Sequence, residues 1–229
     1  MNIAIIGCGY VGYNVARLWQ KELGFSVTTT TTNPERVTEL EAVSQKVFVV
    51  RGDDTEGLKK LLVNQEVVLL SVGAKGANTY EETYLQTAKT LVPLLQESST
   101  IKQVIYTGTY SVYGDKNGDW VDESTPLSPT TANGQILAET ERALMSVSND
   151  KLKVCIFRLG GIFGPGRELL KIFGRTAGTT RPGNGEDTTN WIHLEDIVGA
   201  IEFARKEQLT GVYNLVNDAY LPSRELLDR

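Results

Sequence analysis

Three glycines near the start of the chain have the spacing of a phosphate-binding turn. Gly7, Gly9 and Gly12 lie between the apolar run Ile3–Ile6 and a segment of helical spacing. In such a unit the first glycine permits a tight turn, the second lets a pyrophosphate approach the backbone, and the third allows close helix packing. The helix start then binds the phosphates through its unpaired N–H groups. We therefore predict a dinucleotide site that includes Gly7, Gly9, Tyr10, Val11 and Gly12.

The strand that follows ends in hydroxyl and amide side chains where a carboxylate would select NAD. Proteins that bind NAD place Asp or Glu about 20 residues after the glycines, on the ribose hydroxyls. Here Thr28–Thr32 is followed by Asn33 and, three positions later, by Arg36. Threonines are good strand formers, which explains the run but not the missing acid. Hydroxyl and amide groups do not repel a 2′-phosphate, and arginine binds it. The sequence therefore favours NADP(H) over NAD(H). The residues predicted to hold it here are Thr31, Thr32, Asn33 and Arg36.

Later strand ends add further candidates for the same site. Asp53 and Asp54 follow the third strand. Each either accepts a hydrogen bond from the adenine amino group or caps the helix that starts near Thr55, and one residue can do each. Small residues after the fourth strand allow close passage of a cofactor. The remaining predicted cofactor residues are Ser71, Val72, Gly73 and Thr107.

Short β-branched runs alternate along the chain with segments of helical spacing. This alternation predicts an α/β fold with a doubly wound parallel sheet, the Rossmann fold. Strands are expected over Asn2–Ile6, Phe25–Thr31, Val47–Arg51, Val67–Val72, Gln103–Thr107, Val154–Leu159 and Val212–Val216. Helices are expected over Tyr10–Lys21, Pro34–Ala42, Thr55–Val63, Thr79–Glu97, Thr130–Val147 and Leu194–Lys206.

The domain organisation follows from this alternation. Residues 1–160 form the predicted dinucleotide-binding core, and residues 161–229 form a mixed substrate-side region interleaved with the last core strand and helix. Within that region, Phe163–Asn190 is rich in glycine and has little periodicity. We expect this segment to be a loop over the ligand-binding end of the sheet.

Composition excludes several classes of partner. The net charge of −5, with no long block of one sign, gives no electrostatic footprint for nucleic acid. No segment has the length and hydropathy of a membrane span, and the first ten residues lack the features of a signal peptide. The two cysteines, Cys8 and Cys155, have no metal-ligand spacing. We therefore expect a cytoplasmic protein without a metal site.

Several motifs together resemble the extended short-chain dehydrogenase/reductase superfamily, in its nucleotide-sugar epimerase/dehydratase group. The chain is most similar to atypical members that carry the glycine motif at the N-terminus. The resemblance covers nearly the whole chain, and the motifs are specific only in combination. It depends on Gly7–Gly12, on Tyr106–Gly114 with Val121–Glu123 downstream, on Arg158–Gly166 and on Trp191–Ile197.

The resemblance implies a catalytic pattern from which this sequence departs. In the superfamily a Ser or Thr after strand five holds the substrate, and Thr109 matches it. A Tyr and a Lys four residues later form the usual proton relay, but Asn133 and Leu137 stand at those positions. Neither side chain titrates near neutrality. The sugar dehydratases also carry an Asp-Glu pair where this chain has Tyr110 and Ser111, which argues against that activity.

Four other side chains are candidates to replace the Tyr/Lys proton relay. Tyr113 is interpreted as a packed aromatic with a satisfied hydroxyl. His193, the single histidine, resembles a structural residue at a strand-to-helix corner. Glu123 is interpreted as a solvated loop carboxylate. Cys8 is interpreted as a packing residue, although a helix start can lower a thiol pKa.

The substrate side carries weaker signals. The resemblance implies a small-molecule substrate of the nucleotide-sugar class. Two readings stay open for Arg167, Arg175 and Arg181: they pair with the diphosphate of this substrate, or they are solvated loop charges. Relatives usually continue further, so the resemblance implies a small, incomplete C-terminal substrate region. They also often pair as homodimers through the helices that correspond to Thr79–Glu97 and Thr130–Val147.

Two functions remain compatible with the sequence. The first, which we favour slightly, is an NADP-dependent oxidoreductase or epimerase-like enzyme with a non-standard acid/base group. The alternative is a catalytically inactive NADP(H)-binding regulator or sensor. Thr109 supports the enzyme, whereas Asn133 and Leu137 support the regulator. Because fold predicts function poorly in this architecture, the functional step is an analogy.

Overall fold

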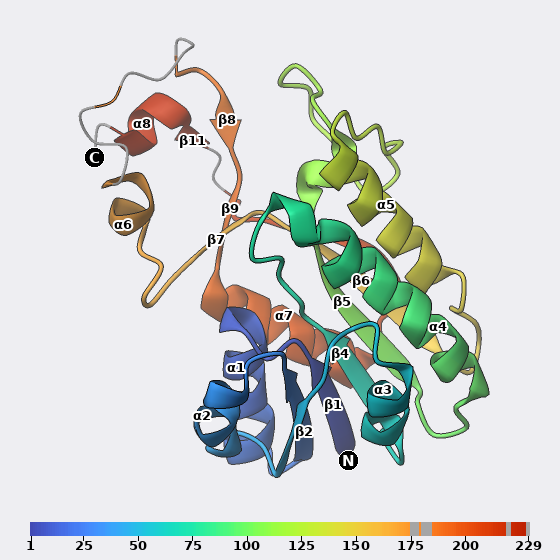
Figure 1. Ribbon diagram of the computed structural model, residues 1–229. Helices are drawn as coiled ribbons and strands as arrows, with labels where there is room; N and C mark the ends of the chain where they lie inside the picture. Colours follow the sequence, from blue (N-terminus) through green and yellow to red (C-terminus); the bar gives the residue numbers. More distant parts are fainter. Residues whose placement is uncertain (175–178, 180–184, 219–220, 228–229) are drawn as a thin grey trace.

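The computed structural model describes residues 1–174, 179, 185–218 and 221–227. Arg175 and Arg181, two of the three arginines considered for a diphosphate, lie outside the described residues. A parallel sheet of seven strands forms the centre of the molecule, in the order β10-β6-β5-β4-β1-β2-β3 (Figure 1). Its strands are β1 (Asn2–Ile6), β2 (Ser26–Thr31), β3 (Lys46–Val49), β4 (Val67–Leu70), β5 (Gln103–Thr109), β6 (Lys153–Leu159) and β10 (Gly211–Leu215).

Helices cover both faces of this sheet, because alternate strand residues are apolar on each side. On one face Ile3 and Ile5 pack with the helices α1 (Tyr10–Arg17), α2 (Val37–Glu41) and α7 (Leu194–Glu207). On the other face Ala4 and Ile6 pack with the helices α3 (Thr55–Leu62), α4 (Thr87–Glu97) and α5 (Ala132–Met145). The predicted doubly wound Rossmann fold is therefore confirmed.

Three of the predicted helices are not α-helical throughout, and one of them, Pro34–Ala42, begins with the 3₁₀ turn η2 (Pro34–Arg36). The first continues past α1 as a π-helical turn, η1 (Leu18–Glu22). The predicted helix Thr79–Glu97 starts with the 3₁₀ turn η3 (Ala77–Thr79) and the π-helix η4 (Glu81–Gln86) before α4 begins. The Thr87 hydroxyl at the start of α4 donates to the Thr83 carbonyl in η4 at 2.8 Å. Single π turns inside helices often occur at functional sites.

The segment predicted as a loop, Phe163–Asn190, contains short elements. The strand β7 (Gly161–Phe163) pairs with β9 (Trp191–His193), and β8 (Thr188–Thr189) pairs with β11 (Leu221–Pro222). The helices α6 (Leu169–Gly174) and α8 (Ser223–Leu227) accompany them. In Figure 1, β8, β11 and α8 lie at the end of the molecule far from the N-terminus. Across the described residues, no helix is both long and apolar enough to cross a bilayer.

A buried ion pair connects the second half of the sheet to α5. The Arg158 guanidinium in β6 donates to the Glu141 carboxylate in α5, with its shortest contact at 2.8 Å. Arg158 also donates to the Tyr113 hydroxyl at 2.7 Å, and its guanidinium carbon lies 4.8 Å from the centre of that ring. Burial of two charges is tolerated only when they are paired and hydrogen-bonded. This contact fixes α5 against the carboxyl ends of β5 and β6.

Candidate functional site

The glycine turn after β1 has room for a ligand at one of its three glycines. Gly7 has φ +86°, and a Cβ there would lie 2.6 Å from the Ser71 carbonyl oxygen. A Cβ on Gly12 would lie 2.7 Å from the Gly7 carbonyl oxygen. A Cβ on Gly9 would meet no atom within 4 Å. The first and third glycines are thus required by packing, while the second faces open space, as a phosphate-binding turn requires.

The start of α1 has no internal anion. Gly9 is its N-cap residue and supplies no side-chain hydrogen bond, and the first turn carries no acidic residue. The first N–H groups of a helix lack partners within the helix and attract negative charge. The turn therefore fits a pyrophosphate.

A cleft of about 410 Å³ opens over the carboxyl ends of β1, β2, β3 and β4. In a doubly wound sheet this edge is where ligands bind, because the strand order reverses there. Among the residues predicted from sequence, those that line the cleft are Gly7, Gly9, Thr31, Thr32, Arg36, Ser71, Val72 and Gly73. The predicted residues outside this lining are Tyr10, Val11, Gly12, Asn33, Asp53, Asp54 and Thr107.

At the tip of β2, most side-chain oxygens already have backbone partners. Thr30, which the sequence analysis missed, accepts from the Gly7 N–H at 2.9 Å and so fixes the glycine turn. Thr31 accepts from the Asn33 N–H at 3.0 Å. Asn33 caps the 3₁₀ turn η2 (Pro34–Arg36) by accepting from the Glu35 N–H at 3.1 Å. Thr32 is exposed at the edge of the cleft.

Arg36 connects this tip to the glycine turn. Its guanidinium donates to the Cys8 carbonyl at 2.8 Å and to both carboxylate oxygens of Glu39 at 3.0 Å. The hydrogen bond from Arg36 holds the pKa of Glu39 below its usual value. Arg36 thus lies beside the phosphate turn, as the sequence suggested, with a carboxylate already bound to it.

Cys8 is a packing residue. Its side chain is buried, and burial raises the pKa of the thiol to about 12, even though Arg36 nearby acts in the opposite direction. The alternative that a helix start lowers this pKa is therefore wrong. Desolvation of the buried thiolate is the largest cause of this shift.

The carboxylates after β3 have local partners. Asp54 caps α3 by accepting from the Gly57 N–H at 2.9 Å. Asp53 pairs with Arg51, whose Nε lies 3.3 Å from its carboxylate. After β4, Ser71 accepts from the Thr107 hydroxyl at 3.1 Å, so Thr107 acts on the cleft through Ser71.

The predicted catalytic positions lie around the ends of β5 and α5. The Thr109 hydroxyl accepts from the Ser111 N–H at 3.3 Å and caps the 3₁₀ turn η5 (Tyr110–Tyr113). Asn133 is half-buried in the first turn of α5. Leu137, one turn later, is 5% exposed and packs in an apolar cluster. The described members of that cluster are Val112, Leu137 and Ala138, with Tyr80, Tyr84 and Leu127 against it.

Two further candidates have structural partners. The Tyr113 hydroxyl donates to the Asn214 side-chain oxygen at 2.8 Å and accepts from Arg158, so the prediction of a packed aromatic is confirmed. His193 caps α7 through Nδ1, which accepts from the Glu195 N–H at 3.3 Å, and its ring packs on Phe163. The structural interpretation of His193 is also confirmed.

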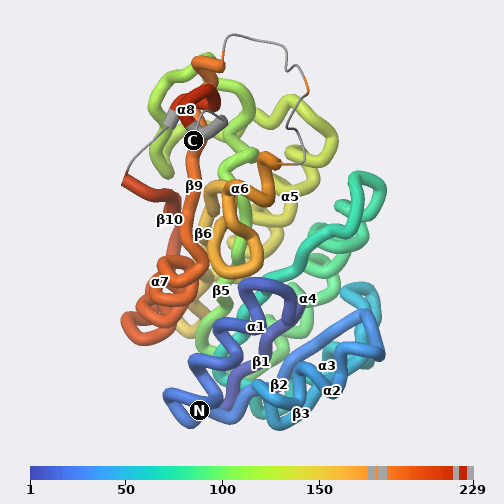
Figure 2. Tube along the Cα trace, turned by 90° about the vertical axis from the view of Figure 1, so that its left-hand side faces the viewer, coloured from blue at the N-terminus to red at the C-terminus, as the bar shows by residue number. Residues whose placement is uncertain are grey.

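The loop after β7 contacts the start of α1 directly. The Tyr10 hydroxyl donates to the Pro165 carbonyl at 2.9 Å, and the Arg167 guanidinium lies over the Tyr10 ring at 5.0 Å. Figure 2 shows the loop before α6 reaching the start of α1. Glu123, on another loop, accepts from the Asn214 N–H at 2.7 Å, a contact that the interpretation as a solvated carboxylate did not include.

Several residues that line the cleft were missed by the sequence analysis. The charged ones are Arg51, Lys75 and Glu82. Arg51 directly precedes the Asp-Asp pair, but nothing in the sequence indicated that it meets Glu82, 31 positions later. With Arg36, the described lining has three cations and one carboxylate, in a chain of net charge −5. Among the described residues, no group of His, Cys, Asp and Glu side chains is arranged to hold a metal ion.

Comparisons with other proteins agree with this geometry. Residues 3–215 match the model of the NAD dependent epimerase/dehydratase family. Protein YeeZ of Escherichia coli K12 is 31% identical over 230 residues, which cover 98% of this chain and 80% of that protein. dTDP-D-glucose 4,6-dehydratase of Dictyostelium discoideum is 30% identical over 138 residues, which cover 52% of this chain and 32% of that one.

Solved structures show the same fold. A conserved protein of unknown function from Silicibacter pomeroyi superposes with a TM-score of 0.77 at 26% identity, covering 99% of this chain and 76% of that one. DesIV, a dTDP-glucose 4,6-dehydratase from Streptomyces venezuelae with NAD and TYD bound, has a TM-score of 0.84 at 20% identity, covering 100% of this chain and 79% of its own. With the glycine turn and the sheet order, these matches show that the chain is of the extended short-chain dehydrogenase/reductase type and belongs to the NAD dependent epimerase/dehydratase family.

Proposed function

We propose that this chain binds NADP(H) and acts as an oxidoreductase or epimerase-like enzyme on a small molecule of the nucleotide-sugar class. The observation that carries the proposal is the cleft at the strand-order reversal, with open space at Gly9 and an uncapped helix start behind it. When bound, the nicotinamide ring supplies or accepts a hydride. Everything else must come from the chain itself.

In this proposal each part of the cleft has a role. The N–H groups at the start of α1 bind the pyrophosphate. Thr31, Thr32 and Arg36 surround the adenosine ribose at the tip of β2. Ser71, fixed by Thr107, and the small residues after it leave room for the cofactor to pass over β4.

Preference for NADP(H) is supported by the charges of the cleft. No carboxylate stands at the tip of β2, and the described lining carries more cations than carboxylates. A 2′-phosphate adds a charge of −1.5 to −2 at neutral pH. It therefore gains more from these cations than a ribose hydroxyl does.

We expect calorimetric titration to give NADPH a dissociation constant at least about tenfold lower than that of NADH, a difference of about 1.4 kcal/mol. Arg36→Gln should remove most of this preference by weakening NADPH alone. Lys60→Gln, which removes an exposed charge on α3, is the matched control and should change neither titration. Equal binding of the two cofactors by the unaltered chain would contradict the preference.

Catalysis, in this proposal, starts from Thr109. Its hydroxyl lies at the end of β5, where it can donate to a substrate carbonyl while accepting from the Ser111 N–H. Asn133 and Leu137 supply no proton, since neither titrates near neutrality. The acid/base group of the enzyme is then a residue outside the usual pair.

The apolar packing of Leu137 favours a second function, that of an inactive NADP(H)-binding regulator or sensor. The position that would hold a lysine in the usual relay lies in a cluster with Tyr80 and Tyr84. Leu137 offers no group to anchor ribose hydroxyls there. A stable complex with NADPH and no turnover is the expected behaviour of such a protein.

Turnover separates the two functions. For the enzyme, we expect NADPH oxidation with a panel of carbonyl compounds that includes 4-keto nucleotide-sugars, and a loss of at least about tenfold in kcat/KM for Thr109→Ala. Ser111→Ala is the matched control, since the contact to Thr109 uses its backbone N–H. NADPH binding with neither oxidation by any panel member nor epimerisation of a nucleotide-sugar in the presence of NADP⁺ would favour the regulator. We further propose a cytoplasmic setting and a homodimer formed through α4 and α5.

A further inference from the structure

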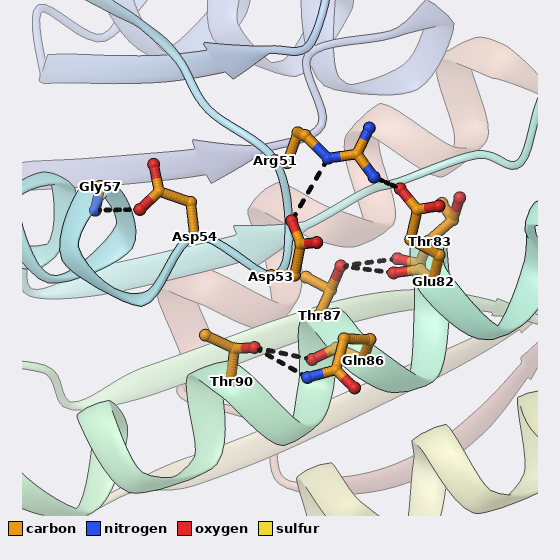
Figure 3. A network of polar contacts seen from close by, with 9 residues as sticks. All are labelled: Arg51, Asp53, Asp54, Gly57, Glu82, Thr83, Gln86, Thr87 and Thr90. Atoms are coloured by element: carbon orange, nitrogen blue, oxygen red, sulfur yellow. Dashed lines mark hydrogen bonds and ion pairs between the residues drawn. The ribbon is translucent and has the colours of Figure 1, made fainter.

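Arg51 and Glu82 form an ion pair at the cleft from two segments far apart in the sequence. Arg51 lies in the loop after β3, and Glu82 lies in the first turn of η4. Both residues line the cleft, and their side chains are 59% and 50% exposed. Figure 3 shows the Arg51 guanidinium between Asp53 of its own loop and Glu82.

Neighbouring residues hold the backbone around Arg51, whereas most of its side chain is exposed. A Cβ on Gly52 would lie 1.7 Å from the Thr87 hydroxyl oxygen, so the loop lies directly against α4. Asp54 holds the other side of the loop by capping α3. An exposed arginine with a long flexible stem can change partners without moving this backbone.

Arg51 is also a neighbour of the predicted ribose site. The strands β2 and β3 pair in parallel, with Thr31 opposite Val49, and the Val50 N–H donates to the Thr31 carbonyl at 3.0 Å. Arg51 directly follows Val50 at the end of β3, and Thr32 directly follows Thr31 at the end of β2. Both line the cleft together with Arg36.

The other arginine at this site already carries a carboxylate. Arg36 binds Glu39 through two nitrogens and the Cys8 carbonyl through the third. For Arg51 the partner inside the lining is Glu82, the one carboxylate among the described lining residues. A phosphate monoester carries more charge than a carboxylate and accepts more hydrogen bonds, so it competes well for an exposed guanidinium.

We infer that Arg51 leaves Glu82 to bind the 2′-phosphate of the dinucleotide, and that Glu82 is the internal competitor that sets how strongly NADP(H) is preferred. The inference rests on the proposed function and assigns two residues outside the glycine turn to cofactor selection. It makes Arg51 a second phosphate ligand beside Arg36. It also gives the ion pair across the cleft a role that the unliganded fold does not require, since both side chains are exposed.

Calorimetric titration with NADPH and NADH tests the inference on the full chain. We expect Arg51→Gln to weaken NADPH about tenfold and to leave NADH unchanged. Glu82→Gln should tighten NADPH several-fold, because Arg51 then keeps only Asp53 as a carboxylate partner. Lys75→Gln removes another cation from the same cleft and is the matched control; it should shift both dinucleotides alike. Adenosine 2′,5′-bisphosphate and 5′-AMP should repeat the Arg51 pattern without the nicotinamide half.

The outcomes separate this inference from the proposed function. If Arg51→Gln weakens NADPH and NADH equally, or changes neither, the inference is overturned while NADP(H) binding stands. If Glu82→Gln weakens NADPH, Glu82 is a ligand and not a competitor, which also overturns it. If the unaltered chain does not prefer NADPH, the proposed cofactor and the inference fail together. The melting temperatures of the Arg51 and Glu82 variants should match that of the unaltered chain, because both side chains are exposed.

Discussion

Replacing Arg158 by methionine is expected to lower the free energy of unfolding by about 3–5 kcal/mol. Arg158 and Glu141 are 5% and 3% exposed, and the guanidinium makes three contacts with the carboxylate at 2.8–3.2 Å. Without Arg158, the Glu141 carboxylate stays buried with no counter-charge, and the Tyr113 hydroxyl loses a donor. Leaving one charge of a buried pair alone costs far more than the pair itself contributes.

Urea denaturation of the variant against the unaltered chain measures this loss. The double variant Arg158→Met with Glu141→Leu should recover most of it, because no charge is then left buried. Lys171→Met provides the control: its pair with Glu168 is solvent-exposed, so it should change stability by less than about 1 kcal/mol. A loss of that small size for Arg158→Met would mean that water reaches the Glu141 carboxylate.

Much of the fold follows from local patterns in the sequence. The strands of the main sheet are short β-branched runs, and each lies within two residues of its predicted bounds. The alternation of these strands with helices predicted a parallel sheet. The short elements β8, β11 and α6 were not predicted, because pieces of two to six residues have too little periodicity to be recognised.

The site divides in the same way. The glycine turn and the tip of β2 are contiguous segments, so their residue types and spacing were enough to indicate a phosphate site. Arg51 with Glu82, and Arg158 with Glu141, meet only once the chain is folded. A side-chain ion pair of this kind has no signature in a single sequence. The hydroxyl of Thr30 was missed for a different reason, because it lay inside a run explained by strand propensity.

The structure gives a physical context for Leu137, the residue at the position where the resemblance implies a lysine. Leu137 lies in a buried apolar cluster with Val112 and Ala138, and two tyrosines pack against this cluster. Restoring a lysine there would place a charge in an apolar cluster, which is unfavourable unless it is paired. The residues around the position are therefore consistent with leucine.

Gly9→Val is expected to abolish dinucleotide binding, with a loss of at least about 100-fold in affinity for NADPH, while the fold stays intact. A Cβ on Gly9 meets no protein atom within 4 Å, and Gly9 has a negative φ, so the free chain tolerates a side chain there. The cost to stability is then limited to a poorer helix cap, about 1 kcal/mol. The added side chain occupies the space where the pyrophosphate has to approach the backbone.

Gly12→Ala is the informative comparison, because its Cβ would lie 2.7 Å from the Gly7 carbonyl oxygen. This smaller substitution should lower the melting temperature, whereas Gly9→Val should leave it within a few degrees of the unaltered chain. Thermal unfolding and NADPH titration of both variants measure the two effects separately. If Gly9→Val binds NADPH normally, the pyrophosphate does not cross this turn, and the open space at Gly9 has no part in binding. If it binds nothing and melts normally, the second glycine serves the ligand alone, whereas the first and third serve the fold.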